Sequence, residues 1–197
     1  MSIKFFVPAL LFVMIAFAPL MYSCKNDPIP VNDQEIITRL TLYFQEKNLS
    51  GNSIGSPAHY SWIDEDGDGG NDPIVDSILL KPLTTYGVTL EVLNESISPA
   101  VDITEEVLTE GTDHQFFFIT EATANITFQY TDKDENQQPI GITATVQTGI
   151  ESHGKLKVVL RHLPDKSAMG VSDGDITNAG GETDFESVPS FDLIIMP

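Results

Sequence analysis

From residue 35 onward, apolar and polar side chains alternate along the chain with a period of two. The first such run spans residues 37–46, where both alternating sets carry some apolar residues, as expected for a strand inside a sandwich. Similar runs, rich in β-branched and aromatic residues, follow at 58–63, 86–93, 115–120, 126–131, 141–147, 155–162 and 190–196. The pattern therefore predicts about eight short strands.

A single short helix interrupts the strand pattern after residue 101. Asp102 is expected to cap it, Glu105 occupies the capping-box position, and Val107 and Leu108 offer a small apolar face before Gly111. Long helices do not alternate with the strands, which argues against a parallel α/β sheet. The predicted fold is all-β, an immunoglobulin-like β-sandwich with one short helix.

The first residues have the pattern of a secretory signal. A positive charge at Lys4 precedes the apolar run 5–21, and the small residue Ser23 comes directly before Cys24. The run is shorter than the roughly 20 residues that span a bilayer comfortably. A permanent membrane anchor remains the alternative.

Cys24 is the only cysteine, so no disulfide can form within the chain. Its position at the end of the signal resembles the lipobox of bacterial lipoproteins, although Tyr22 is bulky for that motif. Lipid attached to Cys24 would hold the protein durably to a membrane. The alternative is a stray thiol behind an ordinary signal peptide. We predict a signal peptide over residues 1–23, a lipidated flexible tether over 24–34 and a single sandwich domain over 35–197.

The chain is strongly acidic, with 29 Asp and Glu against 10 Lys and Arg and a formal net charge of −19. Nucleic acid and anionic lipid headgroups would be repelled, whereas cations and basic partners would be attracted. Apolar residues make up 41% of the sequence and include 11 phenylalanines, enough to build a core, so the chain is not expected to be disordered.

An acidic, glycine-bearing loop at residues 64–72 is the strongest local signal. Asp64, Asp66, Asp68 and Asp72 place carboxylates at the spacing that a Ca²⁺ site uses. Val75 stands where an EF-hand needs a glutamate, so the loop is not an EF-hand. The two interpretations left open are a looser calcium-binding turn and a solvated acidic turn.

A second acidic loop spans residues 170–184 and contains Asp173, Asp175, Asn178, Glu182 and Asp184. It could hold a cation or shape a ligand pocket, or it could be a plain long connection.

Two histidines are candidate ligands although no local zinc motif is present. His114 and His162 come from separate elements and could converge with carboxylates in an oxygen-rich zinc site. The alternative is that both are surface histidines or are satisfied by ordinary hydrogen bonds.

Catalytic motifs are not convincing. The sequence has no Walker loop and no dinucleotide-binding turn. Residues 51–55 spell G-x-S-x-G around Ser53, but a strand-like run follows where a nucleophile elbow needs a helix. We therefore predict a protein that is not an enzyme and has no organic cofactor.

Residues 113–118, 161–166 and 170–184, together with the loop 64–71, resemble a family of small Bacteroidota lipoproteins labelled "type 1 periplasmic binding fold superfamily". The resemblance covers most of the mature chain. It implies an envelope binding lipoprotein that serves a TonB-dependent outer-membrane transporter, and it supplies no catalytic residues. The label itself refers to two α/β lobes around a sugar-like ligand, whereas the period of two in this chain predicts strands.

Together these features predict a non-enzymatic lipoprotein of the outer membrane, anchored on the periplasmic face or the cell surface, that binds a cation or a small ligand. The alternative is a structural or adhesive surface module in which calcium rigidifies the loop at Asp64.

Overall fold

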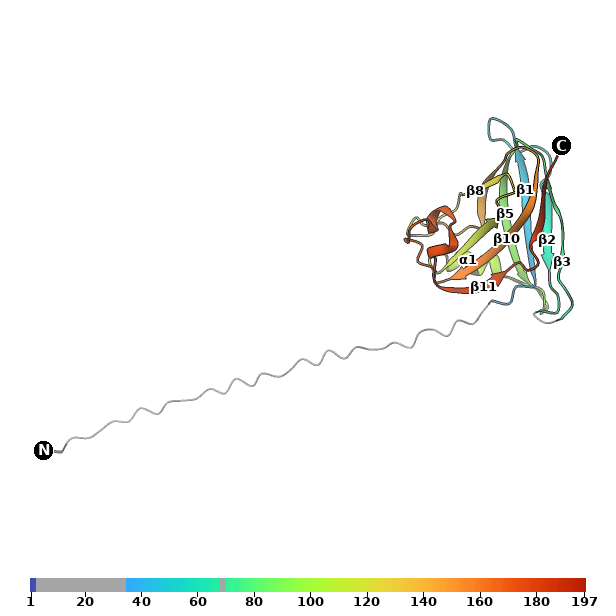
Figure 1. The fold of residues 1–197 in the computed structure, drawn as a ribbon. Coiled ribbons are helices and arrows are strands. Elements are labelled where there is room, and N and C mark those ends of the chain that lie inside the picture. Colours follow the sequence, from blue (N-terminus) through green and yellow to red (C-terminus); the bar gives the residue numbers. More distant parts are fainter. Residues whose placement is uncertain (3–34, 68–69) are drawn as a thin grey trace. The chain divides into compact units, whose positions relative to one another are not determined.

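The computed structural model describes residues 1–2, 35–67 and 70–197 (Figure 1). The predicted signal peptide from residue 3 onward, the tether and the lipidation site at Cys24 lie outside these residues, as does Asp68. Contacts divide the chain into Met1–Asp33 and Gln34–Pro197, and every helix and strand among the described residues belongs to the second unit. No helix within the described residues has the length and apolar character needed to cross a membrane.

Two β-sheets form the domain, and the larger one is antiparallel throughout. Its strand order is β3-β2-β1-β5-β9-β8, with β6 beside β5. The strands are β1 (Arg39–Lys47), β2 (Ala58–Ile63), β3 (Ile74–Val75), β5 (Thr85–Asn94), β6 (Val101–Asp102), β8 (Ile126–Tyr130) and β9 (Thr143–Thr148).

The smaller sheet is built around one long strand. Its members are β4 (Ile78–Leu80), β7 (His114–Thr120), β10 (Ser152–His162), β11 (Glu182–Glu186) and β12 (Phe191–Ile195). Strand β10 pairs with β7 along one edge, and along its other edge it pairs first with β12 and then with β11. Strand β4 closes the sheet by pairing in parallel with β12.

The hydrophobic core lies between the two sheets and explains their alternating burial. The inward positions of the central strands are all buried in one cluster: Leu40, Leu42, Phe44, Val88, Leu90, Val92, Phe116, Leu156, Val158 and Leu160. Each such side chain contributes about 1.5–3 kcal/mol of transfer free energy on burial. The all-β sandwich predicted from the sequence is confirmed.

Strand β7 is apolar on both faces because it serves two cores. Phe116 packs in the main core, whereas Phe117 joins Val159, Val171 and Ala179 in a separate small cluster. The segment that supplies Val171 and Ala179 contains two 3-10 turns, Val171–Asp173 and Ile176–Asn178. These turns cover the outer face of the smaller sheet.

All eight predicted strand regions contain a strand, but the described residues hold twelve strands. Three of the additional strands, β3, β4 and β6, have only two or three residues, too few to show a period. The fourth, β11, reads ETDFE, and its first three residues lie in the predicted acidic loop.

The predicted helix is α1 (Ile103–Thr109), and Asp102 caps it by accepting a hydrogen bond from the Thr104 amide at 2.9 Å. The apolar face differs from the prediction. Ile103 and Val107 are buried, whereas Leu108 is 51% exposed, because residues four apart share a helix face and adjacent ones do not.

Candidate metal centre

His114 is the first residue of β7 and is almost fully buried, with 1% of its surface exposed. It lies directly opposite His162, the last residue of β10. The two rings stack with centroids 4.9 Å apart and an interplanar angle of 18°. The two histidines named from the sequence therefore meet in space, since antiparallel pairing brings the start of one strand to the end of the other.

A β-bulge turns Asp184 toward His114. Strand β11 pairs Phe185 with Leu160 and Thr183 with Arg161, which leaves Asp184 as the extra residue. Asp184 and Phe185 are therefore both buried, although neighbouring residues of a regular strand point to opposite faces. Oδ2 of Asp184 lies 3.6 Å from Nε2 of His114.

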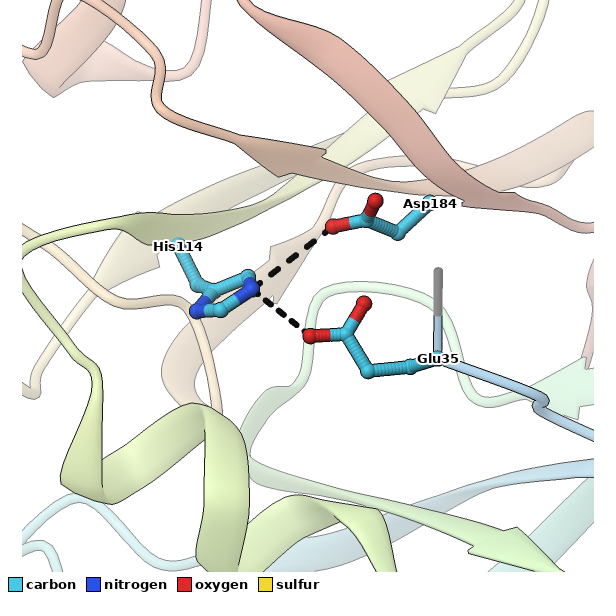
Figure 2. A group of neighbouring side chains, drawn as sticks. All are labelled: Glu35, His114 and Asp184. Atoms are coloured by element: carbon cyan, nitrogen blue, oxygen red, sulfur yellow. Dashed lines mark ion pairs between the residues drawn. The ribbon is translucent and has the colours of Figure 1, made fainter. Parts of the chain in front are cut away.

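Glu35 supplies a second carboxylate from the segment that leads into β1. Thr38 secures this segment, because its amide and its hydroxyl both donate to the carbonyl oxygen of Leu93. The Glu35 side chain is only 7% exposed, and its Oε1 lies 2.8 Å from Nε2 of His114. Figure 2 shows both carboxylates on the Nε2 side of the ring.

The opposite ring nitrogen faces a backbone carbonyl. Nδ1 of His114 lies 3.3 Å from the carbonyl oxygen of Glu110, at the end of α1. A carbonyl oxygen can only accept a hydrogen bond, so Nδ1 carries a proton. Nε2 then presents either a second proton or a lone pair to the two carboxylates. A lone pair in that position faces the two carboxylate oxygens favourably only when a cation or a carboxylic proton lies between them.

The electrostatics of the metal-free cluster favour charged forms. Burial works against the imidazolium of His114, but the contact with Glu35 and its charge raise the pKa of His114 above its ordinary value. Burial likewise works against the Glu35 carboxylate, but the contact with His114 lowers the pKa of Glu35 below its ordinary value. Without a metal ion, a proton on Nε2 therefore supplies the positive charge.

The separations within the cluster suit a metal ion. Nε2 of His114 and one carboxylate oxygen each of Glu35 and Asp184 all lie within 4.8 Å of one another. Ligand atoms about 2.1 Å from a tetrahedral zinc ion are about 3.4 Å apart. The observed 2.8 and 3.6 Å from Nε2 to the two oxygens bracket that separation. Metal-binding histidines also commonly donate the other ring N–H to a carbonyl, as Nδ1 does here.

The polar atoms of the cluster are poorly satisfied by hydrogen bonds. Nε2 of His114 is buried and has only its ion-pair contacts with Glu35 and Asp184, and the buried Oε2 of Glu35 accepts no well-directed hydrogen bond within the described residues. Buried polar atoms in this condition are rare in folded proteins and call for an explanation such as a bound ion.

An acidic cavity of about 670 Å³ adjoins the cluster. Glu35 and Asp184 form part of its lining, together with Glu186 and with Asp64 and Asp72 of the first acidic loop. A cation thus has a negatively charged route from solvent to the two carboxylates.

Within the first acidic loop, two of the predicted calcium ligands serve the turn itself. Asp64 accepts a hydrogen bond from the Gly67 amide at 3.0 Å, and Asp66 accepts from the amide and the side chain of Asn71. The amide of Asn71 lowers the pKa of Asp66. The carboxylates of Asp64, Asp66 and Asp72 do not converge on a common point among the described residues. Calcium binding by this loop stays a prediction.

In the second loop, Asp175 caps a 3-10 turn by accepting from the Thr177 amide at 2.9 Å. Asp173 and Glu182 are exposed and do not belong to the His114 cluster. The residue of this loop that belongs to the His114 cluster is Asp184. Sequence reasoning missed Glu35 and named Asp184 only as one acidic residue of this loop, because no local spacing connects either residue with His114.

Fold and cluster together define a β-sandwich domain with a buried histidine between two carboxylates. No protein-family model, curated protein or solved structure matches the chain. The functional argument therefore depends on the geometry of the cluster.

Proposed function

We propose that this protein is a lipid-anchored envelope protein that binds a divalent transition-metal ion at Glu35, His114 and Asp184 and catalyses no reaction. One observation carries the proposal. Nε2 of a buried histidine faces two carboxylate oxygens, while Nδ1 of the same ring faces a carbonyl.

The ligand set favours particular metals. Imidazole nitrogen suits zinc, iron, copper and nickel, and carboxylate oxygen suits manganese and magnesium as well as zinc. A mixed set of one nitrogen and two oxygens thus favours a borderline ion such as Zn²⁺ over Ca²⁺, which takes six to eight oxygen ligands. Three protein ligands leave a coordination position for water or for a transferred ligand.

The proposed envelope location and the negative charge of the protein support a role in capturing metal ions. An envelope location is supported by the signal-like pattern of the first residues and by Cys24, and the net charge of −19 raises the local concentration of cations. Transfer of the bound ion to a TonB-dependent receptor is the partner interaction that we propose. The same charge disfavours nucleic acid.

Titration calorimetry of the purified, chelator-treated protein with Zn²⁺ tests the proposal. We expect the tightest zinc equivalent to be weakened about 100-fold or more in His114→Gln, because one of three ligands is lost. His153→Gln, which alters an exposed histidine, is the matched control and should bind zinc like the wild type. Circular dichroism establishes that each variant is folded.

Two results would overturn the metal site. One is the absence of zinc binding to the folded wild-type protein. The other is equal zinc affinity in a folded His114→Gln variant and in the wild type.

A further inference from the structure

The cavity beside the His114 cluster is much larger than a metal ion needs. Its volume is about 670 Å³, whereas a water molecule takes up about 30 Å³ and sites for small organic ligands measure roughly 300–1,000 Å³. Glu35 and Asp184 belong to the described lining of the cavity, and His114 does not. An ion held by all three residues would have the imidazole behind it and its remaining coordination position toward the cavity.

The inner end of the cavity is also the part of the structure that calls for a ligand. The Glu35 side chain is nearly buried, and its Oε2 accepts no well-directed hydrogen bond within the described residues. Buried polar atoms in this condition are rare in folded proteins. Glu35 therefore belongs both to the unsatisfied cluster and to the wall of a cavity that is large enough for an organic molecule.

Another wall of the cavity is aromatic and apolar. The rings of Trp62 and Phe185 meet edge to face, with centroids 5.0 Å apart and an interplanar angle of 83°, and both side chains are buried. Nε1 of Trp62 donates to the carbonyl oxygen of Val188 at 3.2 Å, so this N–H group is already satisfied. Ile36 and Val188 extend the apolar surface. Such a wall gains free energy by covering the carbon atoms of a ligand and gains nothing from a hydrated ion.

The charged residues that line the cavity are all acidic among the described residues: Glu35, Asp64, Asp72, Asp184 and Glu186. A divalent ion would offset the charges of Glu35 and Asp184, and Lys157 forms an ion pair with Glu186. The charges of Asp64 and Asp72 remain, so the cavity stays negative when the metal site is filled. Anionic ligands are therefore repelled, whereas uncharged ligands are not.

We propose that this cavity binds a small, uncharged aromatic nitrogen base, whose ring nitrogen takes the remaining coordination position of the metal ion. This inference rests on the proposed function and names the class of ligand that the metal site receives. An aromatic ring nitrogen is a metal ligand of the same kind as histidine and suits Zn²⁺. The flat ring also fits an aromatic wall such as that of Trp62 and Phe185.

The test uses the full chain loaded with one equivalent of Zn²⁺ and titrated in a calorimeter with three probes. Benzimidazole offers a ring nitrogen with a lone pair, indole has nearly the same shape without that lone pair, and benzoate offers an anionic oxygen. We expect benzimidazole to bind at least about tenfold more tightly than either of the others, and at least about tenfold more tightly to the zinc-loaded than to the metal-free protein. With Co²⁺ in place of Zn²⁺, benzimidazole should change the visible absorption of the ion.

A variant of the apolar wall tests whether the base lies in the cavity. Ile36 is 61% exposed, so Ile36→Ser shortens the wall with little effect on the core. We expect its affinity for benzimidazole to fall by about threefold or more, because apolar contact area is lost, while its zinc affinity changes by less than about threefold. Ile150→Ser alters an isoleucine that is 67% exposed and lies outside the lining, and it is the matched control. Circular dichroism establishes that both variants are folded.

The possible failures are distinguishable. Zinc binding that depends on His114, without tighter binding of benzimidazole than of indole and benzoate, overturns the ligand site and leaves the metal site intact. Equal affinity of the zinc-loaded and metal-free proteins for benzimidazole also overturns it. Equal affinity of Ile36→Ser and Ile150→Ser for benzimidazole would place the base outside the cavity. Absence of zinc binding overturns both proposals.

Discussion

A proton and a metal ion compete for Nε2 of His114. The nitrogen is buried beside the carboxylates of Glu35 and Asp184, and the neighbouring charge of Glu35 raises the pKa of the ring. In the metal-free protein the proton balances part of the negative charge. A metal ion must displace this proton, so affinity for metal depends on pH.

We expect zinc affinity to fall by about tenfold per pH unit once the pH is below the raised pKa of His114, and to change little above it. Calorimetry between about pH 5 and about pH 8 measures this dependence, which spans the range in which histidine titrates. His153→Gln should show the same slope. An affinity that stays constant down to about pH 5 would contradict the assignment of Nε2 as a ligand.

The same groups predict how the stability of the metal-free protein depends on pH. The folded pKa of His114 lies above its ordinary value of 6.5, so its contribution is complete below about pH 6.5 and is lost as the pH rises through the folded pKa. The folded pKa of Glu35 lies below 4.5, so its contribution is present above about pH 4.5 and is lost as the pH falls through the folded pKa. Urea denaturation should therefore show a pH-dependent gain near pH 4.5–6.5 that is absent in His114→Gln. A gain of equal size in both proteins would refute the ion pair.

At the scale of elements, a buried lysine holds the loops around α1 in place. Nζ of Lys166 lies 3.0 Å from Oδ2 of Asp134 and donates to the carbonyl oxygens of Gly111 and Pro139. Burial lowers the pKa of Lys166 although Asp134 opposes this shift. One ammonium group therefore holds three segments together. One of these segments contains Gly111, which directly follows Glu110, the residue whose carbonyl oxygen accepts a hydrogen bond from His114.

Replacing Lys166 with methionine should destabilise the protein by about 3–5 kcal/mol, because Asp134 would remain buried without its partner. Urea denaturation measures the change in the free energy of unfolding. Lys133→Met alters an exposed neighbour in the same region and should change stability by less than about 0.5 kcal/mol. If both variants have equal stability, Lys166 does not hold these segments together.

Much of the fold could be predicted from the local sequence pattern. Strands β7 and β11 show where such prediction succeeds and where it fails. The run Phe116–Phe118 reads as a strand because every side chain fits a buried, pleated surface. Strand β11 could not be found this way, since its acidic residues resemble a loop and its pairing depends on β10. The bulge that turns Asp184 inward arises from this pairing and leaves no mark in the sequence.

The candidate site was predictable only in part for the same reason. His114 and His162 could be named because histidine is a common metal ligand, and antiparallel pairing then places them opposite each other. Glu35 and Asp184 were two carboxylates among 29 acidic residues. Their selection required the three-dimensional fold, because burial and proximity to Nε2 distinguish them and neither is a local property.

At the scale of the whole molecule, the cluster joins distant parts of the chain. Glu35 precedes the first strand of the larger sheet, whereas His114 and Asp184 lie on the smaller sheet. A metal ion bound to all three residues would link the two sheets. It would stabilise the folded state and not the unfolded state.

Zinc should therefore raise the melting temperature. A ligand at 100 times its Kd adds about 2.7 kcal/mol, and each kcal/mol is worth about 2–4 °C in a chain of this size, so we expect a rise of roughly 5–10 °C. Differential scanning fluorimetry with and without zinc measures the shift. His114→Gln should show little of it, and an equal shift in this variant would place the bound zinc elsewhere.

The proposed location of the molecule depends on Cys24. We expect the native protein to lack residues 1–23 and to carry several acyl chains on Cys24, because more than one chain is needed for stable anchoring. Mass spectrometry of the protein extracted from membranes measures both modifications. Cys24→Ala should leave the protein out of the membrane fraction, and an unmodified sulfur in the native protein would contradict the anchor.

The most direct test of the metal site is anomalous diffraction at the zinc edge, from crystals of the protein grown with one equivalent of zinc. The proposal predicts a single strong peak about 2.0–2.2 Å from Nε2 of His114 and from one oxygen each of Glu35 and Asp184. A peak at another residue, or no peak at His114 in crystals that contain zinc, would contradict it.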